Sequence, residues 1–381
     1  MWYWGLLVLM IVCAGVYVGW RGAQALFARR WLRVLWMVAV GAVLLGLFPG
    51  KLLRGSPVGF LWHTVSVGWM ITLPYWVMAV VACDVLRIAD RRRPFFPDWV
   101  RSHYAGVKRG VFFATVGAVG LILFEGCLRF ANPVTTPATV RVAKPCGERQ
   151  VLRIAVASDL HLGDLNDKAR LAKNVAQINA LKADLIVLPG DIVDNRLESL
   201  VAQKMHEELL RLKAPLGVFA VLGNHDSFAQ SERCARYLEE RCAIRVLRDE
   251  VVLVADGFYL VGRRDFTERK HRKPLREILR GIDRSKPVIL LDHQPNRLAE
   301  AAGLGVDLQI SGHTHDGQVW PINWVVKFLY EVSNGLGRKG GMSVYVTSGL
   351  NLWGFPARIG TRSEVVDLRV EFNPPQTPPA P

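Results

Sequence analysis

The chain has 381 residues, of which 51% are hydrophobic and 21% are charged, and its net charge at pH 7 is +15. This length allows two or three domains. The first 131 residues hold about two-thirds of the net charge, with 14 Lys and Arg against 4 Asp and Glu. These basic residues lie between long apolar runs, which argues against a nucleic-acid-binding protein and favours a membrane protein. The six cysteines show no zinc-ribbon spacing, and no disulfide is inferred.

Four runs within residues 1–130 are long enough to cross a bilayer, which requires roughly 20 apolar residues. They cover residues 2–20, 31–48, 58–86 and 110–130. The first run could instead be a signal peptide, but it lacks the basic start and the small-residue cleavage site of such peptides. The sequence therefore predicts four transmembrane helices in the inner (cytoplasmic) membrane.

Loop charge predicts the orientation of these helices, because basic loops stay in the cytoplasm. The first loop carries three arginines, and the third carries seven Lys and Arg residues between positions 87 and 109. The second loop has only Lys51 and Arg54. Four crossings then leave both termini outside the cytoplasm, so the rest of the chain is expected on the extracytoplasmic side.

Residues 131–150 contain three prolines and little apolar periodicity, which predicts a linker. The Pro-rich residues 373–381 predict a disordered tail. Between them, residues 151–372 alternate strand-like and helical patterns, as is typical of an α/β domain. Strands are expected at 152–157, 184–188, 217–221, 288–292, 307–310, 343–346 and 365–370, with further short strands in 242–262. Helices are expected at about 168–181, 197–212 and 297–302. The closely spaced late strands indicate a second sheet.

Polar residues follow most of these strands in a fixed order. They read Asp159-Leu160-His161, Gly190-Asp191-Ile192-Val193-Asp194, Gly223-Asn224-His225-Asp226, His293 and Gly312-His313-Thr314-His315. At strand ends these groups can converge, and carboxylate, amide and imidazole ligands together suit Mn, Fe or Zn. Each motif alone is commonly a turn or a surface histidine. The complete series favours two divalent metal ions that share one carboxylate, as in two-metal hydrolases.

The series DxH, GDxxD, GNHD, H and GHxH resembles the calcineurin-like metallophosphoesterase superfamily, from about Leu152 to Val370. The resemblance implies a two-sheet α/β/β/α sandwich and a phosphoric ester hydrolase. It implies one metal, most simply manganese, held by Asp159, His161, Asp191 and His315. It implies a second metal held by Asp191, Asn224, His293 and His313. It further implies that His225 contacts the phosphate and assists the leaving group, and that Asp226 orients His225.

The end of the domain resembles a narrower branch, the membrane-associated YaeI/YkuE-like phosphodiesterases. The resemblance rests on SGHTHDGQVWP from Ser311, RKGG from Arg338 and SGLNLWG from Ser348. Asp316 stands where that branch usually has glycine, and four spans exceed its usual single anchor, so its substrate is not carried over. Two alternatives stay open. One is the lipid A pathway pyrophosphatase, which cleaves UDP-diacylglucosamine on the cytoplasmic side. The other is a non-enzymatic membrane sensor with a metal site.

Residues 320–330, directly after the GHTH motif, are unusually rich in aromatic and aliphatic side chains. One interpretation is ordinary core packing of a short helix. The other is a surface that lies on the bilayer, with Trp and Tyr at the interface and Lys327 toward anionic head groups. In the second interpretation the partners are membrane lipids and a lipid-linked phosphoester. No nucleic-acid partner is expected in either.

Overall fold

The computed structural model describes residues 2–47 and 57–372, which form two compact units. The first unit ends at Cys127 and the second begins at Leu128. The tail predicted at residues 373–381 lies outside the described residues. Each unit is considered by itself below.

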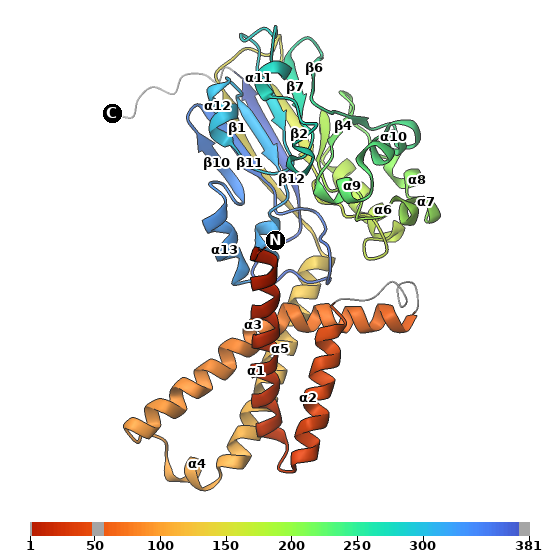
Figure 1. Ribbon diagram of the computed structural model, residues 1–381. Helices are drawn as coiled ribbons and strands as arrows, with labels where there is room; N and C mark the ends of the chain where they lie inside the picture. Colours follow the sequence, from red (N-terminus) through yellow and green to blue (C-terminus); the bar gives the residue numbers. More distant parts are fainter. Residues whose placement is uncertain (1, 48–56, 373–381) are drawn as a thin grey trace, which may run out of the picture. The chain divides into compact units, whose positions relative to one another are not determined.

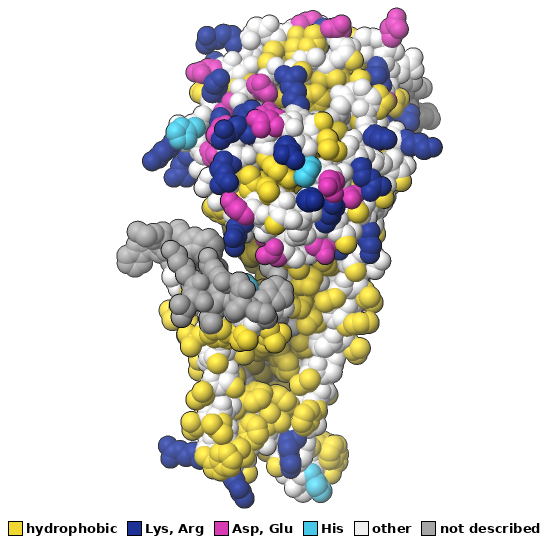
Figure 2. Space-filling view, turned by 90° about the vertical axis from the view of Figure 1, so that its right-hand side faces the viewer, with side chains coloured by type: hydrophobic (Ala, Val, Ile, Leu, Met, Phe, Trp, Pro, Cys, Tyr) yellow, Lys and Arg dark blue, Asp and Glu magenta, His cyan; other side chains and the backbone are white. Residues whose placement is uncertain are grey.

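The first unit is helical (Figure 1). It contains α1 (Trp2–Leu26), α2 (Arg30–Leu45), α3 (Pro57–Arg92), α4 (Asp98–Ser102) and most of α5 (Tyr104–Ala131). Many of its apolar side chains are exposed, such as Val38, Leu61 and Leu121. Figure 2 shows the resulting apolar surface, with Lys and Arg side chains gathered at one end of these helices. An apolar surface of this extent is typical of helices that lie in lipid.

Three helices among the described residues are long and apolar enough to cross a membrane, in contrast to the four predicted. The qualifying segments are Val8–Leu26, Leu61–Arg92 and Tyr104–Ala131. The second predicted run forms α2, which has 16 residues. A helix of that length rises about 24 Å, which is less than the roughly 30 Å of a hydrocarbon core. Residue 48, the end of that run, lies outside the described residues.

The second unit is built on two six-stranded mixed sheets (Figure 1). The first sheet has the order β1-β12-β2-β3-β4-β5. Its strands are β1 (Val134–Val142), β12 (Glu364–Phe372), β2 (Val151–Val156), β3 (Leu185–Pro189), β4 (Val218–Val221) and β5 (Arg245–Val246). The second sheet has the order β10-β11-β9-β8-β7-β6. Its strands are β10 (Gly335–Lys339), β11 (Met342–Val346), β9 (Leu308–Ser311), β8 (Val288–Leu291), β7 (Phe258–Gly262) and β6 (Glu250–Val254).

A continuous apolar layer joins the two sheets. Ile154 and Val187 of the first sheet belong to the same buried cluster as Phe258, Ile289 and Ile310 of the second. The outer face of the first sheet is covered by α6 (Lys168–Ala180), α7 (Leu197–Ala202), α8 (His206–Leu209) and α10 (Ser231–Cys242). The outer face of the second is covered by α11 (Leu275–Ile278) and α12 (Leu298–Gly303). The expected two-sheet α/β sandwich is therefore confirmed.

The predicted linker at 131–150 is wrong over most of its first half, because residues 134–142 form β1. This strand pairs in parallel with β12, from Val134 opposite Glu364 to Val142 opposite Phe372. Pro137 is compatible with a strand here because β1 lies at the sheet edge, where one side of the backbone needs no partner. The prolines that suggested a linker therefore mark an edge strand. The helix expected at 197–212 is likewise divided into α7 and α8.

Parallel pairing brings the ends of several strands to one place. β2, β3 and β4 run parallel to one another, and so do β8 and β9. Their carboxyl ends are Val156, Pro189, Val221, Leu291 and Ser311. The polar motifs identified in the sequence follow these five residues, so the fold places them together at one edge of the sandwich.

Candidate active site

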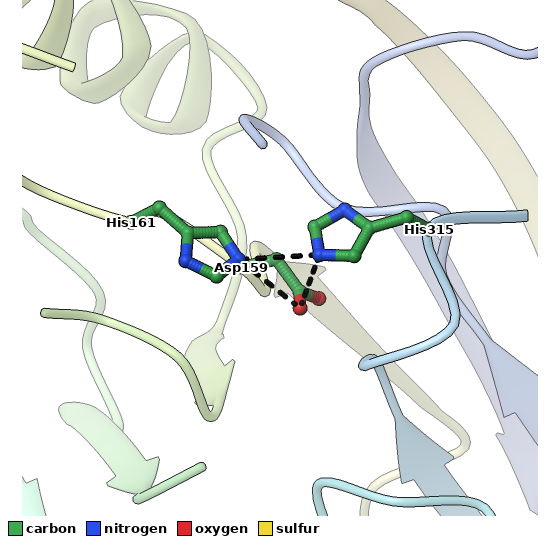
Figure 3. Close-up of side chains that lie close together, drawn as sticks. All are labelled: Asp159, His161 and His315. Carbon is green, nitrogen blue, oxygen red and sulfur yellow. Dashed lines mark hydrogen bonds and ion pairs between the residues drawn. The ribbon is translucent and has the colours of Figure 1, made fainter. Parts of the chain in front are cut away.

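Asp159, His161 and His315 form one cluster of potential metal ligands (Figure 3). Nε2 of His315 lies 3.3 Å from Oδ1 of Asp159 and 3.1 Å from Nε2 of His161. Nε2 of His161 lies 3.8 Å from the same carboxylate oxygen. A metal about 2.1 Å from each ligand separates neighbouring ligand atoms by roughly 3 Å. The three atoms are therefore spaced as ligands of one ion.

A second cluster contains Asp191, Asn224, His293 and His313. Nε2 of His293 lies 3.2 Å from Oδ2 of Asp191 and 3.3 Å from Oδ1 of Asn224. Nδ1 of His313 lies 2.8 Å from the same amide oxygen. Oδ2 of Asp191 is also 3.8 Å from Nε2 of His161 in the first cluster. All seven predicted ligand residues are thus brought together, and Asp191 lies between the two clusters.

The residues present fit two divalent metal ions. The donor set consists of carboxylate and amide oxygens and imidazole nitrogens, which suits Mn, Fe or Zn. Asp159 and Asp191 are buried, and buried carboxylates need a compensating charge such as a metal. Nδ1 of His293 lies 2.8 Å from the carbonyl oxygen of Pro189, which fixes the ring and directs Nε2 toward the cluster.

The backbone at the site is held in an unusual conformation. Five of the seven ligand residues have positive φ, between 41° and 71°: Asp159, His161, Asp191, His313 and His315. Side chains at such residues cost roughly 1–3 kcal/mol each, and they persist where the surrounding structure imposes them. Gly223 and Gly312 allow the close approach, since a Cβ at Gly223 would overlap Oδ1 of Asp191 and one at Gly312 would overlap Asp159.

His225 lies beside both clusters, but its partner differs from the one the resemblance implies. Nδ1 of His225 lies 2.8 Å from Oδ1 of Asp194. Asp226 instead accepts hydrogen bonds from the backbone N–H groups of Gly223 and Val193, at 2.8 and 2.7 Å, and of Ile192 at 3.2 Å. The assignment of Asp226 as the group that orients His225 is therefore corrected to Asp194. Asp226 holds the loop of Asp191 against the loop of Asn224.

The charges around His225 favour its protonated form. Burial by itself would lower the pKa of His225, but the hydrogen bond to Asp194 and the charge of Asp191 raise it above its usual value. Burial would raise the pKa of Asp194, but the imidazole of His161, 3.7 Å away, and that of His225, at hydrogen-bond distance, bring it down to about 2. Burial and the charge of Asp191 raise the pKa of Asp226 to about 7. The anionic partner of His225 at neutral pH is therefore Asp194.

Two structural residues support the site, and neither is among its predicted residues. Arg358 is fully buried and donates to the carbonyl oxygens of His315, Ser348 and Asn351, at 2.7 to 2.8 Å. Asn351 donates to the carbonyl oxygen of Leu160 at 2.8 Å and accepts from Arg170 at 2.6 Å. The two side chains tie the loops of His161 and His315 together. Asn351 lies in the SGLNLWG motif, whereas nothing in the sequence around Arg358 distinguishes it from a surface arginine.

Asp316 also departs from expectation in an informative way. It has φ of 48°, the left-handed conformation in which glycine costs least. Oδ1 of Asp316 is buried and, among the described residues, has no hydrogen-bond partner. Burial raises the pKa of Asp316 above its usual value.

Comparisons with known proteins agree with this geometry. Residues 152–317 match the family model described as calcineurin-like phosphoesterase. An uncharacterized metallophosphoesterase of Helicobacter pylori is 31% identical over 282 residues, which are 72% of this chain and 74% of that protein. A transmembrane protein with a metallophosphoesterase domain from Danio rerio is 29% identical, over 70% of this chain and 65% of that protein. The uncharacterized metallophosphoesterase YkuE of Bacillus subtilis is 28% identical, over 56% of this chain and 77% of that protein.

The different contacts of Asp194 and Asp226 lead to a first prediction. Asp194→Asn should lower kcat about 10- to 100-fold, as loss of a supporting partner typically does. It should also lower the pKa of His225, so that the alkaline limb of the rate profile moves to lower pH. Asp226→Asn should instead lower the melting temperature, because its amide leaves backbone N–H donors unpaired. pH–rate profiles and thermal unfolding of both variants measure the difference. A shifted pH profile with unchanged melting temperature in Asp226→Asn would restore Asp226 as the partner of His225.

Proposed function

Because this chain belongs to the calcineurin-like phosphoesterase family and is a phosphoesterase, we propose that it hydrolyses its substrate with two divalent metal ions. The substrate is a phosphodiester, a phosphomonoester or a pyrophosphate. The observation that carries the proposal is the place of Asp191, whose Oδ2 lies 3.8 Å from His161 and 3.2 Å from His293. One carboxylate oxygen within reach of both clusters is what two ions with a shared ligand need.

When bound, two such ions clamp phosphate oxygens and make a water molecule more acidic. The chain's own residues position the phosphate and protonate the departing oxygen. The seven ligand residues determine where the phosphate lies relative to His225. Asp194 holds Nδ1 of His225, which leaves Nε2 to donate a proton to the departing oxygen. Phe228 and Trp353 flank the His225 ring, with centroids 5.7 and 6.0 Å away, and limit the water around it.

A non-enzymatic metal sensor receives less support from the site. A degenerate site loses ligands, whereas here every position of the series is filled and the atoms converge. Asp194 also holds His225 in position as a proton donor. A metal sensor does not need a proton donor, so this arrangement favours an enzyme.

The second prediction separates metal binding from proton donation. Asp191→Asn should lose most bound metal and most hydrolysis of bis-p-nitrophenyl phosphate or a phosphomonoester analogue in the presence of Mn. His225→Ala should keep its metal and lose roughly 10²- to 10⁴-fold in kcat, the usual contribution of a general acid. Metal analysis of both proteins accompanies the assay, with His271→Ala as a control histidine outside the site. Activity close to the unmodified protein in both variants would refute the assignment.

We further propose that the substrate carries an apolar, lipid-like portion. The supporting feature is α13 (Ile322–Leu329), which follows the 3-10 turn at His315–Gly317. Trp324 is 63% exposed and Phe328 is 90% exposed, and of the whole helix only Asn323 is buried. The interpretation that this segment packs into the core is therefore wrong. Such a face beside a polar site marks a membrane or ligand surface rather than ordinary exposure.

Chain connectivity supports contact between α13 and a bilayer. α5, which is long and apolar enough to cross a membrane, ends at Ala131, and β1 begins at Val134. The intervening residues span at most roughly 10 Å. Arg170 donates to the carbonyl oxygen of Phe130 at 2.6 Å and lies over its ring, so the end of α5 is held by the second unit itself. So short a connection limits how far the start of β1 can lie from a membrane that α5 crosses, and this supports the proposal.

The third prediction tests this surface. Trp324→Ser with Phe328→Ser should weaken hydrolysis of a lipid phosphoester in vesicles and leave a soluble phosphoester unaffected. Both side chains are exposed, so the melting temperature should stay unchanged. The matched control is Val201→Ser with Leu210→Ser. These two side chains are 51% and 50% exposed and lie outside α13. Equal losses on both substrates with a lower melting temperature would mean that α13 supports the fold and not a lipid.

We propose that residues 131–381 face the extracytoplasmic side of the inner membrane. The orientation depends on the basic loop between α3 and α5 and on one crossing by α5. Arg21 pairs with Asp84, and Lys108 donates to the carbonyl oxygen of Gln24 at 3.2 Å. These contacts bring the carboxyl ends of α1 and α3 to the amino end of α5. The first and third loops therefore lie at the same end, which supports a common cytoplasmic location.

The fourth prediction concerns this orientation. Alkaline phosphatase fused after Phe130 should be active, and the same reporter fused after Leu86 should be inactive, because the enzyme folds only outside the cytoplasm. A cytoplasmic reporter such as a fluorescent protein should give the reverse pattern. Activity after Leu86 and none after Phe130 would place the site in the cytoplasm. That result would favour the UDP-diacylglucosamine pyrophosphatase alternative.

A further inference from the structure

A cavity of about 380 Å³ lies within the helical unit, and its lining includes none of the residues of the metal site. It is open on one side and lined by parts of α1, α3, α4 and α5. Its volume falls in the range of roughly 300–1,000 Å³ that is usual for ligand pockets. Most of its wall is apolar, with Val18, Trp76, Val80 and Phe112 among the lining residues. The cavity is therefore suited to a chain of hydrocarbon character.

One group of lining residues is charged, and its charges do not balance. Arg21, Arg87 and Lys108 line the cavity together with one carboxylate, that of Asp84. Arg21 uses its guanidinium on Asp84 and on Gln24, which lies 2.8 Å away. Asp84 also accepts from the hydroxyl of Tyr17 at 2.7 Å. Among the described residues that line the cavity, Asp84 is the one carboxylate, and it is already paired with Arg21.

Arg87 and Lys108 keep hydrogen-bonding capacity for another partner. Arg87 approaches Asp84 only to 3.9 Å, and its buried Nε has no hydrogen-bond partner within the described residues. Lys108 donates to the carbonyl oxygen of Gln24 and lies 5.2 Å from the centre of the Tyr104 ring. An unpartnered guanidinium donor in an apolar setting is costly, and a phosphate oxygen is the acceptor that suits it best.

We propose that this cavity binds an anionic phospholipid, with an acyl chain along the apolar wall and its phosphate at Arg87 and Lys108. Charge complementarity and the orphan donor of Arg87 select an anionic over a zwitterionic head group. In the orientation proposed above, this end of the helices lies in the cytoplasmic leaflet. That leaflet carries anionic lipid in many membranes. The binding itself depends neither on that orientation nor on the phosphoesterase activity.

The test uses the purified full chain, stripped of lipid in detergent and titrated with phosphatidylglycerol or phosphatidylcholine, with retained lipid counted by native mass spectrometry. Phosphatidylglycerol should be retained in preference to phosphatidylcholine. Arg87→Gln with Lys108→Gln should weaken its retention about tenfold or more, the size expected for lost charge-assisted hydrogen bonds. Arg92→Gln with Arg109→Gln removes the same charge from exposed positions outside the cavity and should change little.

A second variant guards against misfolding of the first. Ala79→Phe narrows the cavity while both cations remain, and it should also reduce phosphatidylglycerol retention, with thermal unfolding showing that the protein is folded. Glycerol 3-phosphate, the head group without chains, should not displace the lipid. Equal retention of the two lipids, an equal loss in the Arg92 and Arg109 control, or full retention by Ala79→Phe would each overturn the proposal. Complete displacement by glycerol 3-phosphate would mean that the site takes a soluble phosphate instead.

Discussion

Both metal clusters depend on the distance between two sheets. Asp191 follows β3 of the first sheet, whereas His293 follows β8 of the second, and their side chains meet at 3.2 Å. That distance is maintained by the apolar layer between the sheets, where Val187 of β3 and Ile289 of β8 are both buried. Because packed interiors transmit small shifts, a change in this layer moves one set of ligands relative to the other. The geometry of the site therefore depends directly on the packing of the core.

The site adds its own local cost to that constraint. Positive φ at five ligand residues and crowding at Gly223 and Gly312 mean that the loops would not adopt these conformations alone. Their support comes from side chains that bind backbone rather than substrate. Asp226 accepts hydrogen bonds from three backbone N–H groups. Arg358 donates to the carbonyl oxygens of His315 and Ser348. These buried charged groups are tolerated because hydrogen bonds replace the water that they lose.

The helical unit and the phosphoesterase unit follow different physical rules. In the second unit most apolar side chains are buried between and around the sheets, and Trp324 and Phe328 are among the exposed ones. In the first unit apolar side chains are exposed along the helices, and Figure 2 shows Lys and Arg side chains gathered at one end. Asp84, which is partly buried there, is paired with Arg21. Arg87 and Lys108 line the cavity without a carboxylate of their own, which is why we propose them as a binding site.

The sequence by itself determined the family and the sandwich, and it singled out the polar residues that the fold brings together, because these residues follow apolar strands and strand ends meet when strands are parallel. It also located the apolar helices. It failed for α2, where an apolar run continued past the helix end, and for β1, where prolines suggested a linker. Only the tertiary structure decided that Asp194 rather than Asp226 contacts His225. Both aspartates lie near His225 in the motif series, and which one reaches Nδ1 depends on how two loops pack. Arg358 and the exposure of α13 were equally undecidable from the chain, since burial is a property of what packs against a residue and not of the residue itself.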